Sequence, residues 1–378
     1  MGALARLWDE KVRAARRLEG RLAPGEAVEA RRDHHARRPP RPCGMTIHTG
    51  VGCSMGCLYC YVPDMGFPMR PRPYPLTPAQ MAYALAVNPY VLPRSTLAAY
   101  GSVTEPFLPE TRERALGYIR EVRRWLALPS QVSTKAVLDP GLAGALRAAD
   151  PDISVLVTVV ALGEWARRLE PGAPPAEERI EAAGAAARAG LKVALFVRPI
   201  IPGVTDRQAG EIFELAAEAG IRYAVLGTLR VTPGILERLS RAGVDPGAIE
   251  SRLPRRPRGP RDQVTIRGGD LKAAVAAEAR ARGIEVLPAA CSHNIIAHGE
   301  YCRACRLGPC GDPARARRVD PGEVEELLEA AGLRARAAWA GPGLLRLRVA
   351  GGREEARRAR LLAEAAARVR VVVEGGRA

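Results

Sequence analysis

The pattern of apolar and polar positions predicts strands and helices that alternate along the chain. From residue 44 onward, short β-branched runs are followed by longer stretches rich in Ala, Leu, Arg and Glu. The apolar runs predict strands at Met45–Thr49, Leu97–Gly101, Gln131–Thr134, Ile153–Val160, Leu191–Arg198 and Tyr223–Leu229. The stretches between them predict helices at about 77–87, 109–127, 140–149, 176–189 and 206–219. This alternation, with nearly continuous apolar strands, indicates a parallel sheet covered by helices, either a barrel or a doubly wound sheet.

The pattern continues beyond the sixth strand. A proline- and arginine-rich connector, Arg252–Arg261, predicts an exposed loop. A further helix, Gly269–Arg282, and a short strand, Ile284–Leu287, come after it. We therefore assign residues 43–288 to the α/β body of the protein.

The two ends of the chain differ from this body. Residues 1–42 carry a net charge of +5 and end in prolines, which predicts a basic N-terminal arm. Residues 289–317 form a cysteine-rich segment. Residues 318–378 follow the order helix, strand, strand, helix, strand, which predicts a small α+β module.

Composition is that of a globular protein. The 378 residues are 47% hydrophobic and 26% charged. The longest apolar stretch, 153–163, is interrupted by Thr158 and is much shorter than the roughly 20 residues of a membrane helix. The first 22 residues mix acidic and basic side chains and lack the apolar run of a secretory signal. We therefore expect a cytoplasmic protein with no membrane partner.

The net charge of +16 favours a polyanionic partner such as nucleic acid, since neutralised phosphates release counterions. A genome biased toward arginine explains the same excess, because only four of the 57 basic residues are Lys. Base stacking has few aromatic side chains to use, and the tryptophans are Trp8, Trp125, Trp165 and Trp339. Charge alone therefore leaves the partner open.

Seven of the eight cysteines form two groups, and Cys43 stands alone. The first group, C-x3-C-x2-C, is Cys53, Cys57 and Cys60. The second, C-x10-C-x2-C-x4-C, is Cys291, Cys302, Cys305 and Cys310. In a chain with its own core and no secretory signal, such spacing favours metal or cluster ligands over disulfides. Three thiolates leave one metal position open for a substrate or cofactor; the alternative is a zinc site completed by His48.

The loop Cys53-Ser54-Met55-Gly56-Cys57-Leu58-Tyr59-Cys60 follows the first predicted strand and resembles the C-x3-C-x-aromatic-C motif of the radical S-adenosylmethionine (SAM) superfamily. The resemblance implies a partial (β/α)6 TIM-type barrel. It also implies a [4Fe-4S] cluster on the three cysteines, with SAM chelated at the fourth iron. Reductive cleavage of SAM would then yield methionine and a 5′-deoxyadenosyl radical, with the electron coming from a partner such as ferredoxin or flavodoxin.

Further segments are similar to the spore photoproduct lyase-like branch of that superfamily. They are Tyr59–Tyr61, Gly101–Glu110, Ser133–Lys135 and Arg198–Asp206, and they lie where an α/β barrel gathers its active-site loops. The resemblance implies that Glu105, with Gly101, Ser102 and Thr104, binds the methionine ammonium. It also implies contacts to SAM from Ser133, Lys135, Arg198 and Tyr59.

The second cysteine group departs from the usual pattern of that branch. It indicates either an auxiliary [4Fe-4S] cluster or a structural zinc ion on four thiolates. Alternatively, Cys291 is a free hydrogen donor. His293 and His298 flank this group and are candidates for metal ligation or proton transfer.

Three hypotheses remain open at this point. The first is a radical SAM enzyme that modifies or repairs a nucleic acid. The second keeps the radical chemistry but acts on a peptide or small metabolite. The third is a metal-stabilised nucleic-acid-binding protein without catalysis.

Overall fold

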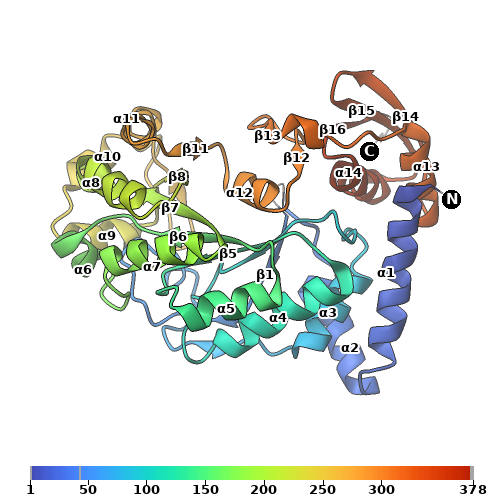
Figure 1. Cartoon of the computed structure of the whole chain (residues 1–378), viewed down its shortest axis with the longest axis horizontal. Helices are drawn as coiled ribbons and strands as arrows, with labels where there is room; N and C mark the ends of the chain where they lie inside the picture. The colour runs from blue at the N-terminus through green and yellow to red at the C-terminus, as the bar shows by residue number, and fades with distance from the viewer. Residues whose placement is uncertain (1, 42–43, 375–378) are drawn as a thin grey trace.

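The structure is a computed structural model that describes residues 2–41 and 44–374 (Figure 1). Its centre is a parallel sheet of seven strands in the order β1-β4-β5-β6-β7-β8-β11. The strands are β1 (Met45–Ile47), β4 (Ala98–Tyr100), β5 (Ser130–Thr134), β6 (Ser154–Thr158), β7 (Lys192–Ile200), β8 (Tyr223–Thr228) and β11 (Glu285–Leu287). Spatial order follows chain order throughout, whereas a doubly wound sheet reverses near its middle. The sheet is therefore a partial TIM-type barrel, and β11 extends the six predicted strands by one.

Helices cover the outer face of this sheet. They are α3 (Pro78–Val87), α4 (Arg112–Leu126), α5 (Pro140–Ala149), α6 (Gly163–Leu169), α7 (Ala176–Arg188), α8 (Thr205–Glu218), α9 (Pro233–Arg241), α10 (Pro246–Glu250) and α11 (Gly269–Ala281). Several start at a side-chain cap, as where Thr77 accepts a hydrogen bond from the Gln80 N–H before Pro78. All five residues of β6 are buried, because helices and neighbouring strands enclose it on every side.

Residues 2–41, the described part of the segment expected as a basic arm, are folded onto the barrel. Helices α1 (Ala3–Glu19) and α2 (Pro24–Arg32) precede a short 3-10 helix, η1 (His34–Ala36). Leu18 and Ala30 are almost fully buried in the barrel core. Helix α1 has an apolar face at helical spacing; its arginines are exposed, whereas Lys11 is buried on the packed face.

The C-terminal elements form a cysteine-rich segment and a separate module. The segment holds α12 (Ala290–Ala297), β12 (Tyr301–Cys302), β13 (Cys310–Gly311) and η2 (Pro313–Arg315). The module holds α13 (Pro321–Ala330), β14 (Arg334–Gly341), β15 (Leu344–Ala350), α14 (Arg353–Ala367) and β16 (Arg370–Glu374). In the module sheet, β15 pairs antiparallel with β14 and parallel with β16. Apolar residues of both helices and all three strands give the module a core of its own, which Leu4 of α1 joins.

Two short ribbons complete the described chain. They pair β2 (Gly50–Val51) with β3 (Arg72–Pro73) and β9 (Arg230–Val231) with β10 (Val264–Thr265). The connector Arg252–Arg261 has no regular secondary structure, as its prolines predict. None of the described helices is both long and apolar enough to cross a membrane.

Candidate active site at the carboxyl ends of the barrel strands

The first cysteine group lies at the carboxyl end of β1. Cys53, Cys57 and Cys60 line a cavity of about 260 Å³ together with residues at the carboxyl ends of β4 to β8. Glycine is required at the start of this loop. Gly52 has a φ of +85°, and a Cβ atom there would lie 2.4 Å from the Pro68 carbonyl oxygen. The fold therefore brings the three predicted ligands to one place, with the opening of the cavity among the strand ends.

The thiols of this loop are shielded from water. Burial raises the pKa of the Cys57 thiol to about 12, and it also raises the pKa values of Cys53 and Cys60. These groups are therefore protonated at neutral pH unless a cation displaces the protons. A set of three clustered, desolvated thiols suits iron or zinc, which bind thiolate in a site of low polarity.

Arg238 of α9 fixes the backbone of the cysteine loop. Its Nε donates to the Leu58 carbonyl oxygen at 3.1 Å and its Nη2 to the Cys60 carbonyl oxygen at 2.8 Å. The same guanidinium makes a bidentate pair with Asp64, at 2.8 and 3.0 Å. Sequence reasoning missed this residue, because an arginine on an amphipathic helix more often faces solvent.

Glu105 is a buried carboxylate aimed by the ends of β4 and β5. Its Oε1 accepts from Thr134 Oγ1 at 2.5 Å and its Oε2 from the Lys135 N–H at 2.8 Å. Burial raises the pKa of Glu105, although these donors act in the opposite direction. A cationic ligand such as an ammonium group would stabilise the charged form. The predicted position of Glu105 in the site is therefore consistent with its geometry.

Tyr59 and Lys135 belong to a second buried network beside the cysteines. The Tyr59 hydroxyl donates to Glu170 Oε1, and Arg179 Nη2 donates to Glu170 Oε2 at 2.5 Å. Lys135 Nζ lies 3.8 Å from Glu170 Oε1 and 5.4 Å from the centre of the Tyr59 ring. Burial lowers the pKa of Lys135, but the Cys57 and Glu170 groups outweigh it and the net shift is upward. Lys135 is therefore a cation held beside the thiols.

Glu170 and Arg179 were not predicted from the sequence. Arg179 is 1% exposed and lies on α7, where it also donates to the Thr158 carbonyl oxygen at the end of β6. Its neighbours in sequence are acidic, which is typical of a solvated helix face. The burial of the Arg179 guanidinium becomes apparent only from the packing of α6 and α7 against the barrel.

The other predicted cofactor residues line the same cavity: Gly101, Ser102, Thr104, Ser133 and Arg198. Ser102 Oγ is buried and has no hydrogen-bond partner among the described residues. A ligand with a polar group would satisfy this atom. A Cβ at position 101, where φ is +92°, would lie 2.5 Å from the Ser133 carbonyl oxygen, so only glycine fits there. The cavity therefore offers a polar group to a cofactor at Ser102 and has no side chain at position 101 to keep the cofactor from the backbone.

The second cysteine group converges on a different cavity, of about 790 Å³. Cys302 and Cys310 are paired neighbours in the β12–β13 ribbon, Cys291 lies on α12, and Cys305 is exposed in the turn between the strands. The four predicted ligands thus line one space. Cys43 lies outside the described residues.

This second cavity lies at the amino ends of the barrel strands, opposite the end that carries the first cysteine group. It is lined by Leu97, immediately before β4, and by Thr46 in β1. Helix α12 caps the amino ends of two further strands, since Asn294 donates to the Pro129 carbonyl oxygen and Ser154 bonds to His293. Cys53, Cys57 and Cys60 lie at the carboxyl ends. The two cysteine groups therefore do not share a cavity, and Cys291 is not placed to donate hydrogen into the first one.

The flanking histidines have structural partners. His293 Nδ1 lies 2.8 Å from Ser154 Oγ, and burial lowers the pKa of His293 to about 4. His298 Nε2 accepts from the Ser130 N–H at 3.4 Å. Both side chains hold α12 against the sheet. His48 does not join the three thiols of the first group; its Nδ1 lies 3.1 Å from His34 Nε2.

Comparisons with known proteins agree with this geometry. Residues 47–216 match the model of the radical SAM superfamily. An uncharacterized protein of Acidianus two-tailed virus, ORF301, is 27% identical over 175 residues, which cover 42% of this chain and 56% of that protein. The chain thus spans about half the length of this curated relative.

Solved structures of spore photoproduct lyase variants share the fold. One, with bound AdoMet and dinucleoside spore photoproduct, has a TM-score of 0.55 and 17% identity over 68% of this chain and 79% of that chain. Another has a TM-score of 0.54 and 18% identity over 66% and 78%. The region that matches the radical SAM superfamily model contains the three-cysteine loop after β1, and the solved structures share the partial barrel fold.

Proposed function

We propose that this enzyme cleaves SAM reductively at a [4Fe-4S] cluster on Cys53, Cys57 and Cys60, and that the reaction modifies or repairs a nucleic acid. The observation that carries the proposal is the convergence of three thiols and the buried Glu105 on one cavity. When bound and reduced, the cluster supplies the electron that splits SAM into methionine and a 5′-deoxyadenosyl radical. The protein binds, orients and shields the reactants.

The chain's own residues divide this work. Glu105 would hold the ammonium group of SAM, because its carboxylate is aimed by Thr134 and desolvated. Ser102 Oγ and Ser133 offer hydrogen bonds, and Lys135 and Arg198 offer positive charge for the SAM carboxylate. Gly101 lets the Ser133 carbonyl oxygen approach the chain closely, and Thr104 lines the same cavity.

Water exclusion is a second task of these residues. Met55, Cys57 and Leu108 are buried together beside Tyr59, in an apolar cluster of the cysteine loop. The Tyr59 hydroxyl donates a hydrogen bond to Glu170, so the ring can face the ligand without leaving a polar group unpaired. A dry cavity protects a reactive radical from quenching and strengthens the electrostatic contacts.

We propose that the second cysteine group holds an auxiliary [4Fe-4S] cluster, with zinc as the alternative. Seven arginines line its cavity, namely Arg38, Arg41, Arg306, Arg357, Arg360, Arg368 and Arg370, and Glu364 is the only acidic side chain among the described lining residues. This charge suits an anionic cluster and an acidic electron donor such as ferredoxin or flavodoxin. A centre at this edge of the sheet would serve stability or electron entry rather than contact with the substrate.

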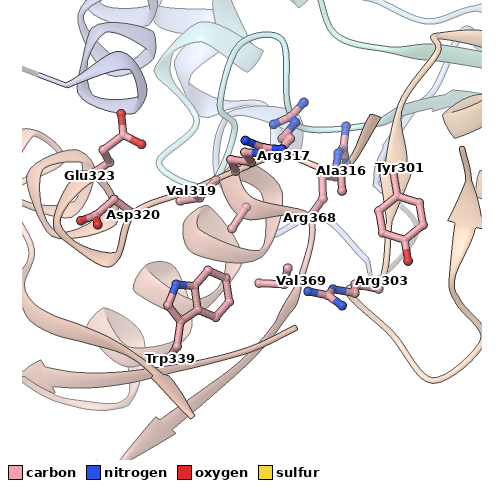
Figure 2. A pocket seen from close by; sticks show the side chains of 12 residues that line it. Tyr301, Arg303, Ala316, Arg317, Val319, Asp320, Glu323, Trp339, Arg368 and Val369 are labelled. Atoms are coloured by element: carbon pink, nitrogen blue, oxygen red, sulfur yellow. The ribbon is translucent and has the colours of Figure 1, made fainter. Parts of the chain in front are cut away.

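Two features support a nucleic acid as substrate. The net charge is +16, which favours phosphate contacts. In addition, Trp339 is 42% exposed and lines a cavity of about 420 Å³ together with Arg303 (Figure 2). Arg318 lines the same cavity. An exposed indole beside guanidinium groups suits an unpaired base and its phosphate. A spore photoproduct lyase variant of the same fold has a dinucleoside photoproduct bound.

The experiment begins with protein purified without oxygen and reconstituted with iron and sulfide. Iron per chain and 5′-deoxyadenosine release are then measured under reducing conditions. About eight irons with release fit two cubane clusters, and about four irons with release assign zinc or free thiols to the second group. Absence of SAM cleavage, or retained cleavage in Cys57→Ala, would contradict the proposal.

Substrate class is tested separately by binding of DNA and tRNA at several salt concentrations. Affinity that falls steeply with salt supports a nucleic acid. Binding that is absent or independent of salt would point to a peptide or small metabolite instead. General unfolding of Cys57→Ala without any cleavage by the parent protein would favour a structural metal and no catalysis.

A further inference from the structure

Three histidines converge between the N-terminal helices and the barrel, outside both cysteine groups. His34 and His35 lie in η1, which follows α2, and His48 is the first residue after β1. One ring nitrogen from each lies within 4.8 Å of the other two. The two elements are separated by eight residues of the chain, and packing of the N-terminal helices onto the barrel brings them side by side.

Hydrogen bonds from Asp33 and Tyr74 fix two of the three rings. His35 Nδ1 lies 2.7 Å from Asp33 Oδ1, so Nδ1 carries the proton and Nε2 carries the lone pair. The Tyr74 hydroxyl donates to Asp33 Oδ2 at 2.7 Å, and His34 Nδ1 lies 3.1 Å from the Tyr74 oxygen. Because that hydroxyl proton is already used, His34 Nδ1 donates and His34 Nε2 also carries a lone pair.

These two nitrogens, His34 Nε2 and His35 Nε2, both face His48. His34 Nε2 lies 3.1 Å from His48 Nδ1, and His35 Nε2 is the acceptor for the His48 backbone N–H at 3.2 Å. Two imidazole ligands on one tetrahedral zinc ion lie about 3.3 Å apart when each Zn–N bond is about 2.0 Å. The rings are thus placed either to share a proton or to share a metal ion.

The surroundings favour the metal. An imidazole that gives its second N–H to a carboxylate, as His35 does to Asp33, is the usual support of a zinc ligand. The His35 side chain is fully buried and that of His48 is partly buried, so both rings are shielded from bulk water. His34, by contrast, has a side chain that is 44% exposed, which leaves a path from solvent.

Arg38 is the opposing charge. Its positive charge acts on all three histidines and would oppose a bound cation. Asp33 offsets this charge from the other side. Arg38 Nη2 is buried without a hydrogen-bond partner among the described residues, so an anion or hydroxide at a fourth metal position would give it one.

We propose that His34, His35 and His48 bind a zinc ion whose fourth position is taken by water or a small anion. Three neutral imidazoles with an open position suit zinc among the available divalent ions. The ion would join η1 to the first residue after β1, and so tie the N-terminal helices to the strand that leads into the cysteine loop. This site does not depend on the proposed reaction.

The test uses the full chain with its cysteine groups already reconstituted with iron and sulfide. The protein is dialysed against Zn²⁺ alone, and zinc per chain and the zinc X-ray absorption spectrum are measured. We expect about one zinc per chain with only nitrogen or oxygen neighbours at about 2.0 Å. Sulfur neighbours at about 2.3 Å would assign the ion to the cysteines and overturn the proposal, as would a protein that binds no zinc.

Variants separate ligand from supporting roles. His34→Asn, on the exposed side, and His48→Gln should each lose the bound zinc. Tyr74→Phe keeps all three imidazoles and should weaken zinc binding by 10- to 100-fold, the usual effect of losing a supporting hydrogen bond. His298→Gln, outside the group, should bind zinc like the parent. Equal zinc content in His48→Gln and His298→Gln, with circular dichroism showing both folded, would overturn the proposal.

Discussion

The guanidinium of Arg238 donates to the main-chain carbonyl oxygen of Cys60 at 2.8 Å. A helix that begins far along the chain thus sets the backbone of the third predicted iron ligand. The same side chain reaches Leu58 and Asp64, so one group fixes three points of the loop. Ligand geometry in this site therefore depends on α9 as well as on the cysteine motif.

Arg238→Ala should release the cysteine loop. We expect iron bound by the first group to fall and 5′-deoxyadenosine release to drop at least about tenfold, since misplaced reactive groups cost about that much or more. Arg238→Lys should recover little, because an ammonium cannot span two carbonyls and a carboxylate. Arg241→Ala, an exposed residue of the same helix, is the control. Normal iron content and release in Arg238→Ala would show that the loop holds its shape unaided.

Glu105→Gln should weaken SAM binding without unfolding the protein. The amide keeps an oxygen acceptor for Thr134 but loses the negative charge that, in the proposed function, would face the ammonium group of SAM. A charge-assisted hydrogen bond is worth about 1.5–3 kcal/mol, so we expect affinity to fall by about 10- to 100-fold. Calorimetric titration of SAM into the reconstituted protein measures this. Exposed Glu110→Gln serves as the control, and equal affinities in the two variants would remove Glu105 from the SAM site.

Arg179→Met should destabilise the fold strongly. It leaves Glu170 buried without its closest cation, and breaking a buried pair in this way costs about 3–5 kcal/mol. Adding Glu170→Gln removes the stranded charge and should restore part of the loss. Urea unfolding of the two variants, at equal iron content, gives the free energies. If the double variant is no more stable than Arg179→Met, the pair is not the source of the effect; exposed Arg188→Met should change little.

Lys11 predicts a pH dependence of stability. Burial, and then the charge of Arg358, lowers the pKa of Lys11 well below 10.5 in the folded protein. Between the two pKa values the unfolded chain holds the additional proton, so the free energy of unfolding rises as pH increases toward 10.5. Lys11→Met should flatten that rise, whereas exposed Lys192→Met should not. Urea unfolding between pH 7 and 9 gives the free energy of unfolding at each pH. The same pH dependence in Lys11→Met and the parent protein would contradict a lowered pKa of Lys11.

The opposite positions of the two cysteine groups predict separable iron losses. Cys302→Ser should lower iron by about four per chain if the second group holds a cubane cluster. It should leave SAM binding intact, because Cys302 does not line the cavity that holds Glu105. Iron analysis and calorimetric SAM titration on the same preparation measure both. A Cys302→Ser protein that keeps its iron but loses SAM affinity would mean that the two groups are coupled.

The body of this fold was predictable because its signals are local. Apolar runs marked the barrel strands, and β11 was marked as well, although periodicity could not place it in the sheet beside β8. The cysteine loop was predictable for the same reason, since its ligands lie within eight residues. Glu105 and Lys135 were expected from their resemblance to a family, and each now lines the cavity.

The rest depends on contacts between distant segments. Arg179 and Arg238 lie on helices where charge usually means solvent, and only packing turns them inward. The sequence pattern predicts a charged arm for His34 and His35, because it does not indicate that they contact His48. The direction of α12 likewise cannot be deduced from the cysteine spacing. That direction places the second cysteine group at the amino ends of the barrel strands.

Helix α1 has one further consequence. Its residue Leu4 packs into the core of the C-terminal module, while Leu18 packs into the core of the barrel. At 1.5 Å per residue these contacts lie about 21 Å apart along one rigid rod. Neither body can melt without exposing part of the apolar face of that rod, so this helix couples the thermal unfolding of the two bodies.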